Sequence, residues 1–205
     1  MQPVVNPRYP GLAVRVADEG FAAYIWGSDF SFEVSAYAVA EREVPVADWA
    51  LRRIVPYRKC YGIDPEEFSS YRNAADSEIF MAYLDDQPVG HVVVSTNWNG
   101  YAHIDELAVH APARRHGVAR ALLDVAQFWS RRKKLPGMML ETQNNNLGAC
   151  RLYEQCGYVV GGVDHLRYRG IDPQTAEVAI FWYRLFANEP VSYTHLRAHE
   201  TKANL

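Results

Sequence analysis

The segment from Ile104 to Ala119 constrains the fold of this chain more than any other. It begins as an apolar, β-rich run, passes through Arg114-Arg115-His116-Gly117-Val118-Ala119, and continues with helical periodicity. Backbone N–H groups at a helix N-terminus have no partner inside the helix, so they attract anions together with the helix dipole. Gly117 allows close approach of a ligand to the backbone, and the arginines add charge-assisted contacts. Two interpretations follow: a diphosphate site, or an ordinary basic start of a helix.

The segments around this turn predict a mixed fold. After Pro112, the residues Val118, Leu122, Val125, Ala126 and Trp129 recur at helical spacing, which predicts an amphipathic helix that ends before Pro136. A second helix is expected at residues 147–155, a helix start at 64–68, a strand within 30–44 and irregular chain after it. Apolar, β-rich runs predict further strands at residues 12–16, 79–84, 89–95, 101–109, 138–142, 158–163 and 179–186. We therefore predict an α+β class, with a mixed, mostly antiparallel central sheet flanked by helices.

Bulk composition limits the class of protein. The chain has 205 residues and a formal net charge of -3, which fits one globular domain and gives no support to nucleic-acid binding. Its three cysteines, Cys60, Cys150 and Cys156, have no metal-ligand spacing, so we expect no bound metal. Because no signal peptide or membrane-length apolar run is evident, we expect a cytoplasmic protein without a membrane partner.

The sequence changes character near Pro190. The run from Val191 to Thr201 looks like the translation of sequencing-adapter DNA and continues no pattern of the preceding strand. We therefore expect residues 1–189 to form the single domain and residues 190–205 to be a non-native tail. His195 and His199 are accordingly left out of the candidate site.

A second group of residues carries possible chemistry. Asn146 is a plausible cap for the helix at 147–155, and Tyr153 lies seven residues later, two turns along nearly the same helix face. Considered alone, a tyrosine in this setting is more often a packed aromatic than a catalyst. Its meaning therefore depends on the anion-binding turn that precedes it in the chain.

The two groups together resemble the GNAT superfamily of N-acetyltransferases. The resemblance rests on the order of strand, RxxGxA turn, helix, strand, NxxAxxxY helix and GY strand, over about residues 78–185. Within that superfamily, NWNGYAHIDELAV, MMLETQNNN and IFWYRLF resemble the streptothricin acetyltransferases. The chain departs from the common pattern at Arg115 and Ala119, where many members have glycine.

This resemblance implies a GNAT fold, acetyl-CoA as the acetyl donor, and a place for it between splayed fourth and fifth core strands. The backbone of Leu107, Ala108 and Val109 would pair with the pantetheine arm like an added strand. Asn146 and Tyr153 would lie near the thioester, and members of the family often dimerise, which makes residues 180–186 a candidate homodimer interface. The pyrophosphate would be held by Arg114, Arg115, His116, Gly117, Val118 and Ala119.

Amide formation needs a base for the acceptor amine and a proton for the departing thiolate. A primary amine is mostly protonated at neutral pH, so Asp105 or Glu106 is expected to take its proton. Successive strand residues face opposite ways, so only one of the two faces the cleft unless a bulge intervenes, and we favour Glu106. A surface salt bridge or a substrate clamp is the alternative role for either acid. Tyr153 is the candidate proton donor, and Cys150 lacks an activating histidine for covalent catalysis.

The resemblance implies that the acceptor is the β-lysine amine of streptothricin, a small polycation. Acidic side chains at Asp105, Glu106, Glu141 and Asp164 would attract it. Trp98, Tyr101 and Tyr168 are candidate aromatic contacts, although each is individually more typical of packing. Alternatives are an acetyltransferase for an aminoglycoside, a polyamine or a protein N-terminus, a non-catalytic acyl-CoA-binding module, and a generic phosphate-binding domain.

Overall fold

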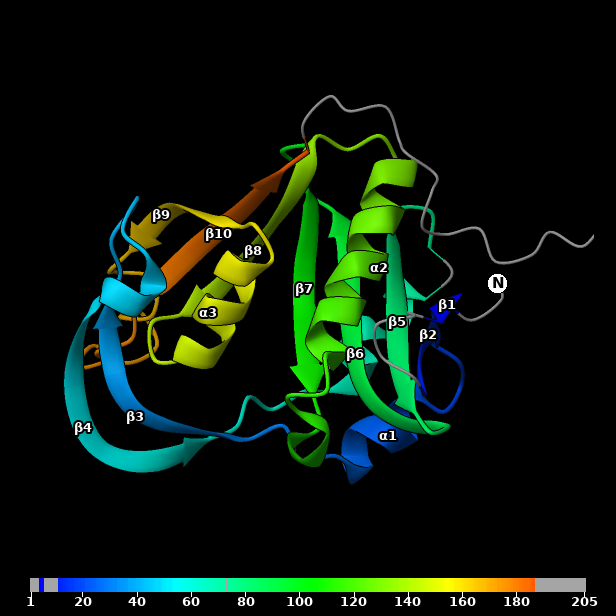
Figure 1. Ribbon diagram of the computed structural model, residues 1–205, viewed down its shortest axis with the longest axis horizontal. Coiled ribbons are helices and arrows are strands. Elements are labelled where there is room, and N and C mark those ends of the chain that lie inside the picture. The colour runs from blue at the N-terminus through cyan, green and yellow to red at the C-terminus, as the bar shows by residue number, and fades with distance from the viewer. Residues whose placement is uncertain (1–3, 6–10, 73, 187–205) are drawn as a thin grey trace, which may run out of the picture.

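A computed structural model describes residues 4–5, 11–72 and 74–186 of the chain (Figure 1). The tail expected at residues 190–205 lies outside the described residues. None of the described helices is long and apolar enough to cross a membrane. The elements, in chain order, are β1 (Val4–Val5), β2 (Leu12–Val16), α1 (Phe21–Gly27), β3 (Phe32–Val39), η1 (Val46–Asp48), β4 (Ala50–Lys59), η2 (Pro65–Tyr71), β5 (Ser77–Leu84), β6 (Gln87–Thr96), β7 (Ala102–Val109), η3 (Ala111–Ala113), α2 (Val118–Arg132), β8 (Gly137–Gln143), α3 (Leu147–Gln155), β9 (Val159–Asp164) and β10 (Ala179–Leu185).

The main sheet has eight strands in the order β1-β2-β5-β6-β7-β8-β10-β9. Among the described residues its one parallel pair is β7 with β8, which α2 connects as the crossover that parallel neighbours require. These two strands pair only where residues 102–104 lie beside residues 138–140. Beyond that point they diverge, as Figure 1 shows. The predicted class and the splayed pair of core strands are confirmed.

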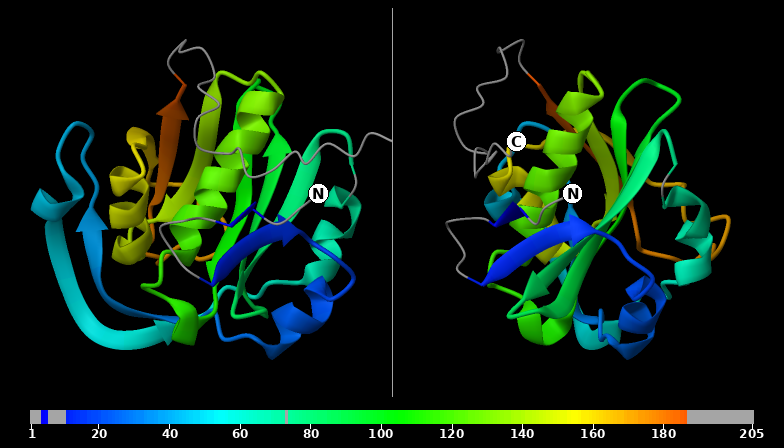
Figure 2. Two further views of the ribbon diagram at one scale, coloured as in Figure 1. Left: turned by 45° about the vertical axis from the view of Figure 1, so that its right-hand side comes forward. Right: turned by 90° about the vertical axis from the view of Figure 1, so that its right-hand side faces the viewer.

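Helices cover both faces of the sheet (Figure 2). On one face α2 packs against β5, β6 and β7 with its apolar stripe, and α3 lies beside it over β8. A continuous buried core forms there, in which Leu122 and Leu140 are almost fully enclosed. On the other face α1 and η2 cover a smaller core around Ile79 and Val93. The helical spacing seen in the sequence after Pro112 therefore marked the side of α2 that meets the sheet.

A separate two-stranded ribbon of β3 and β4 curves past α3 (Figure 1). It is joined to the main body where the Ala38 N–H donates to the Asn144 carbonyl at 2.9 Å and the Asn144 side chain donates back to the Ala38 carbonyl at 3.0 Å. A backbone N–H of η1, that of Val46, donates to the Glu154 carboxylate of α3 at 2.8 Å. The ribbon thus carries the end of β4 to the region where β7 and β8 separate.

The N-terminal third contains the errors of the sequence-based fold. The chain after the 30–44 strand was expected to be irregular, yet β4 occupies residues 50–59. Almost all of β4 is exposed, so its sequence shows no apolar alternation. It also includes Pro56, and proline within a strand is typical of edge strands. The helix α1 was not predicted, because it has only seven residues and its Gly20 N-cap makes no side-chain hydrogen bond. The expected helix start at 64–68 is a 3-10 helix, capped by Asp64 accepting from the Glu66 N–H at 3.0 Å.

Candidate active site

A cleft of about 790 Å³ opens where β7 and β8 separate. Past Ile104, the backbone groups of β7 that face β8 have no partner strand. The sequence-predicted residues that line the cleft are Asp105, Glu106, Leu107, Ala108, Val109, Arg114, Arg115, Gly117, Val118, Ala119, Glu141, Asn146, Tyr153 and Tyr168. The fold thus brings α3 together with β7, the turn that follows β7, and the start of α2.

One part of the cleft, the turn side (Arg114–Arg120), is built around left-handed backbone. Arg115 has φ of 71° and Gly117 has φ of 78°, the latter serving as the N-cap of α2 without a side-chain cap. Successive N–H groups in such a turn form a concave site for an anion. The left-handed region favours glycine, which explains why many members of the resembled superfamily have glycine at the position of Arg115.

Arg114 has a different role from the one expected. Its guanidinium donates to three backbone carbonyls, those of Val109 at 3.1 Å, Ser31 at 2.8 Å and Phe30 at 2.9 Å. The side chain therefore joins the start of the ribbon to the end of β7, and it also occupies the Val109 carbonyl. His116 is exposed and does not line the cleft. Two cations that the sequence analysis missed, Arg120 and Arg151, do line it.

A β-bulge in β7 brings two consecutive carboxylates to the cleft. Val93 of β6 pairs with Glu106 and Val94 pairs with Ile104, so Asp105 is the extra residue. Both acids line the cleft. The Asp105 carboxylate, however, accepts from Ser95 Oγ at 2.6 Å and lies 3.0 Å from His103 Nδ1. The possibility of a bulge, left open by the sequence, is confirmed.

Glu106 is the carboxylate with unusual electrostatics. Burial raises its pKa to about 7, and the nearby Glu67 adds to the shift, while a hydrogen bond from the Leu107 backbone opposes it. Within the described residues it forms no ion pair with lysine or arginine. A carboxyl group with a pKa near neutrality exchanges a proton readily at physiological pH.

Two residues of α3 frame the cleft as expected. Asn146 caps the helix, since its Oδ1 accepts from the Ala149 N–H at 3.1 Å, and its Nδ2 makes no hydrogen bond within the described residues. Tyr153 is 7% exposed, packs against Tyr158 and Trp182, and makes no side-chain hydrogen bond in the described part of the chain. Burial raises the pKa of Tyr153, so its phenol stays protonated. Burial likewise raises the pKa of the Cys150 thiol to about 12, so the thiol stays protonated rather than forming the nucleophilic thiolate.

Three predicted substrate contacts are not brought to the cleft. Trp98 is 93% exposed in the turn before β7, and Tyr101 packs on Tyr183 at the same end. Both come before the paired stretch of β7, whereas the cleft opens after it. The Asp164 carboxylate accepts from the backbone of Leu166 and Arg167, so it caps a loop. The NWNGY motif therefore forms an aromatic turn at the end of β7 away from the cleft, so its side chains do not line the cleft.

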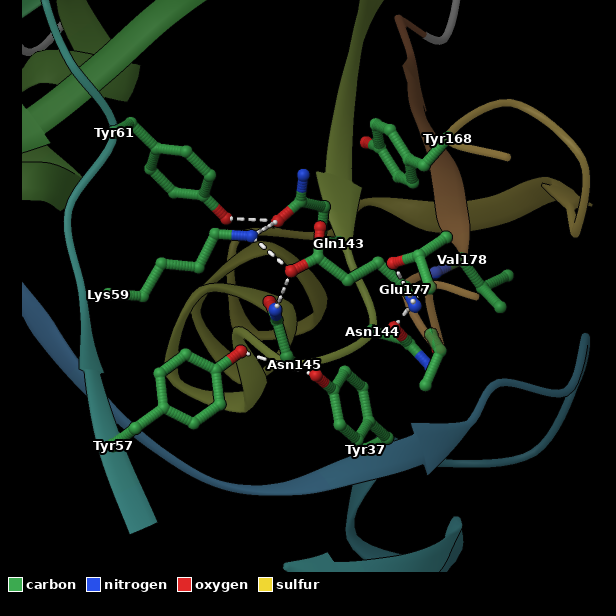
Figure 3. Close-up of polar contacts among 12 residues, drawn as sticks. Tyr37, Tyr57, Lys59, Tyr61, Gln143, Asn144, Asn145, Tyr168, Glu177 and Val178 are labelled. Atoms are coloured by element: carbon green, nitrogen blue, oxygen red, sulfur yellow. Dashed lines mark hydrogen bonds and ion pairs between the residues drawn. The ribbon is translucent and has the colours of Figure 1, made fainter. Parts of the chain in front are cut away.

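The other part of the cleft, the tyrosine side (Tyr61, Glu141, Gln143 and Tyr168), comes from three separate segments. Glu141 and Gln143 project from one face of β8, because they are two residues apart on a strand. Gln143 accepts from Tyr61, and Glu141 accepts from Tyr168 and pairs with Arg167. Figure 3 shows the two tyrosines on either side of Gln143. Glu141 and Tyr168 were among the predicted substrate contacts, whereas Tyr61 and Gln143 were not, since no local pattern joins residues 61 and 143.

Comparison with known proteins agrees with this architecture. A family model, the Acetyltransferase (GNAT) family, matches residues 46–158, more than half of the chain. The chain belongs to this family. As a GNAT member it is an acetyl-CoA-dependent N-acetyltransferase, as the sequence predicted.

Individual relatives of this GNAT protein share a name. Streptothricin acetyltransferase A of Bacillus subtilis (strain 168) is 35% identical over 164 residues, covering 77% of this chain and 94% of the relative. The streptothricin acetyltransferase of Escherichia coli is 36% identical over 132 residues, covering 64% of this chain and 72% of the relative. A Bacillus anthracis protein assigned as a streptothricin acetyltransferase, solved with acetyl coenzyme A, matches with a TM-score of 0.76 at 35% identity, covering 85% of this chain and 99% of that one. The predicted GNAT fold is confirmed.

Proposed function

We propose that this enzyme transfers the acetyl group of acetyl-CoA to a primary amine of a cationic antibiotic, the β-lysine amine of streptothricin. The observation that carries the proposal is the meeting of Glu106 and Tyr153 in one cleft with the anion-binding turn of α2. The identity of 35–36% to relatives named streptothricin acetyltransferase supports the choice of acceptor.

The residues of the cleft fit the donor. Strand β7 offers unpaired backbone groups at Leu107 and Ala108 for the amides of a pantetheine arm, in the manner of strand addition. The left-handed turn at Arg115 and Gly117 suits a pyrophosphate, with Arg120 nearby to add charge. When bound, acetyl-CoA supplies an acetyl group activated as a thioester.

Glu106 would act as the general base. An acceptor amine enters mostly as an ammonium ion, and the ionised Glu106 carboxylate takes one proton to give the neutral nucleophile. Its pKa of about 7 means that it is substantially ionised at physiological pH yet still basic enough to accept the proton. Asp105, whose carboxylate is already bound by Ser95 and His103, is assigned to support of the bulge instead.

Tyr153 would act as the general acid. It reaches the cleft from α3 and keeps its proton, because burial raises its pKa. Its hydroxyl group has no side-chain partner within the described residues, so its hydrogen is free to be given to the departing thiolate. Direct transfer between two bound substrates then needs no covalent enzyme, in line with the raised pKa of Cys150.

A panel assay tests the acceptor. Purified enzyme is mixed with acetyl-CoA and, separately, streptothricin, an aminoglycoside, a polyamine and a peptide with a free N-terminus, and the release of free thiol is followed. Of the four acceptors, we expect rapid turnover only of streptothricin, and mass spectrometry should place the acetyl group on the β-lysine moiety. Turnover of another amine without streptothricin would reject the proposed acceptor, and cofactor binding without any transfer would reject catalysis.

A further inference from the structure

The single hydrogen of the Tyr61 hydroxyl group is already committed. It donates to Gln143 Oε1 at 2.7 Å, and Lys59 Nζ donates to the same oxygen at 2.6 Å (Figure 3). A phenol has one hydrogen to give, but its oxygen can also accept. The hydroxyl oxygen of Tyr61 is therefore left as an acceptor.

The direction of this hydrogen bond is fixed by Lys59. Turning the Gln143 amide over would place its NH₂ group against a lysine ammonium, and neither group can accept. Lys59 is itself held in place by an ion pair with Glu177, and both side chains are only 17% exposed. Gln143, Lys59 and Glu177, none of which is assigned a role in the reaction, thus keep the Tyr61 oxygen available as an acceptor.

Tyr61 also lies where an incoming amine must be held. It lines the same cleft as Glu106, and burial, with smaller contributions from Glu177 and Glu106, raises the pKa of Tyr61, so the phenol stays neutral. Its ring packs on Phe32 with centroids 5.6 Å apart. Phe30 and Ile63 extend this apolar wall within the cleft. A neutral oxygen acceptor on an apolar wall, in the same cleft as a carboxylate, suits an ammonium group carried by an alkyl chain.

We propose that Tyr61 is a substrate-binding residue, which accepts a hydrogen bond from the ammonium group of the acceptor beside Glu106 and selects primary alkylamines. This inference rests on the proposed function. One N–H bond of the ammonium ion breaks as its proton forms an O–H bond with the Glu106 carboxylate. A second N–H group stays on Tyr61, and the freed lone pair is left to attack the acetyl carbonyl.

The variant Tyr61→Phe tests the inference with streptothricin as the acceptor. Loss of a hydrogen bond to a charged group predicts a KM for the acceptor that rises by about tenfold to 100-fold. The KM for acetyl-CoA should stay unchanged and the Tm should fall only slightly, because the ring remains in place and only the hydrogen bond to Gln143 is lost. Tyr37→Phe is the matched control: it removes a hydroxyl group bonded to Tyr57 on the ribbon, outside the cleft, and should leave the acceptor KM unchanged.

A second pair of variants reaches Tyr61 without changing it. Gln143→Glu keeps an oxygen for Tyr61 and Lys59, so the acceptor KM should remain within about threefold of wild type. Gln143→Leu removes that oxygen and should raise the KM as Tyr61→Phe does.

An unchanged acceptor KM in Tyr61→Phe, or an equal rise in the KM for acetyl-CoA, would overturn the inference. If the wild-type enzyme turns over a different amine of the panel, the proposed acceptor is wrong. The ratio of KM values between Tyr61→Phe and wild type, measured with that amine, still decides the role of Tyr61.

Discussion

The turn side and the tyrosine side of the cleft are built in different ways. The turn side is one continuous stretch, Arg114–Arg120, and it offers mainly backbone groups shaped by left-handed residues. The tyrosine side joins residues 61, 141–143 and 168 through side-chain hydrogen bonds. The first arrangement suits a donor common to a whole family. The second can change with a few substitutions, so it is where acceptor preference is expected to differ between relatives.

The largest expected effect lies at Tyr153, which lines the cleft from α3 and belongs to neither side. Tyr153→Phe keeps the ring and removes the proton donor, so kcat should fall by about 10³-fold. The KM values for donor and acceptor should change little, because neither side of the cleft loses a contact. Thiol release measures kcat, and calorimetry with coenzyme A checks donor binding. Unchanged turnover would remove Tyr153 from the mechanism.

The next effect concerns Glu106 and pH. As a base it must be ionised, so kcat/KM should rise with pH up to about 7 and then level off. Glu106→Gln should lower kcat/KM by about 10²-fold and remove that inflection. A profile of kcat/KM between pH 5 and 9 for both proteins measures this. An inflection retained in Glu106→Gln would assign the base to another group.

The same substitution, which lowers kcat/KM, should raise the stability of the folded protein at high pH. The folded-state pKa of Glu106 lies above its usual value, so the associated stability is fully present at low pH and is lost as pH rises through about 7. Glu106→Gln should therefore unfold at a higher temperature than wild type at pH 8. Its free energy of unfolding should be higher by on the order of 2 kcal/mol at that pH, with little gain near pH 5. Thermal unfolding at the two pH values compares them. Asp105→Asn is the control, since it weakens an existing set of hydrogen bonds and should gain nothing.

The smallest effect should be confined to the turn side. Gly117 has φ of 78°, and a side chain in left-handed backbone costs about 1–2 kcal/mol, so Gly117→Glu should raise the KM for acetyl-CoA at least about tenfold. Charge repulsion of a phosphate acts in the same direction. Gly100→Glu is a matched control, because Gly100 has φ of 86° in a turn outside the cleft. It should lower the Tm without changing that KM, and equal KM values in both variants would contradict the assignment of the turn.

The sequence predicted the α-helices and strands from β5 onwards, although not the short η3, because period, spacing and glycine placement are local signals. On the turn side it named Arg115, Gly117, Val118 and Ala119, but it missed Arg120, and His116 does not line the cleft. Glu106 and Tyr153, each within a recognisable strand or helix, do line the cleft. On the tyrosine side, Tyr61 and Gln143 were missed. Tyr61 follows an exposed strand that lacks alternation, and its partner Gln143 lies over 80 residues away. Trp98 and Tyr101 were chosen because they are aromatic and near the motif, yet position along β7 puts them beyond the cleft.

The extra residue at Asp105 has a consequence for how this enzyme can evolve. Ala102 and Ile104 face the α2 core, and so do Leu107 and Val109, so the side-chain alternation of β7 changes phase at the bulge. If β7 kept all its residues but alternated regularly, Glu106 would share the face of Ala102 and Ile104 and point into that apolar core. The orientation of the proposed base therefore depends on the register between β6 and β7 as well as on the residues of the strand. Deletion of Asp105 would remove the bulge and leave Glu106 on its present face, whereas a one-residue shift in the pairing would turn Glu106 away from the cleft although every side chain was kept.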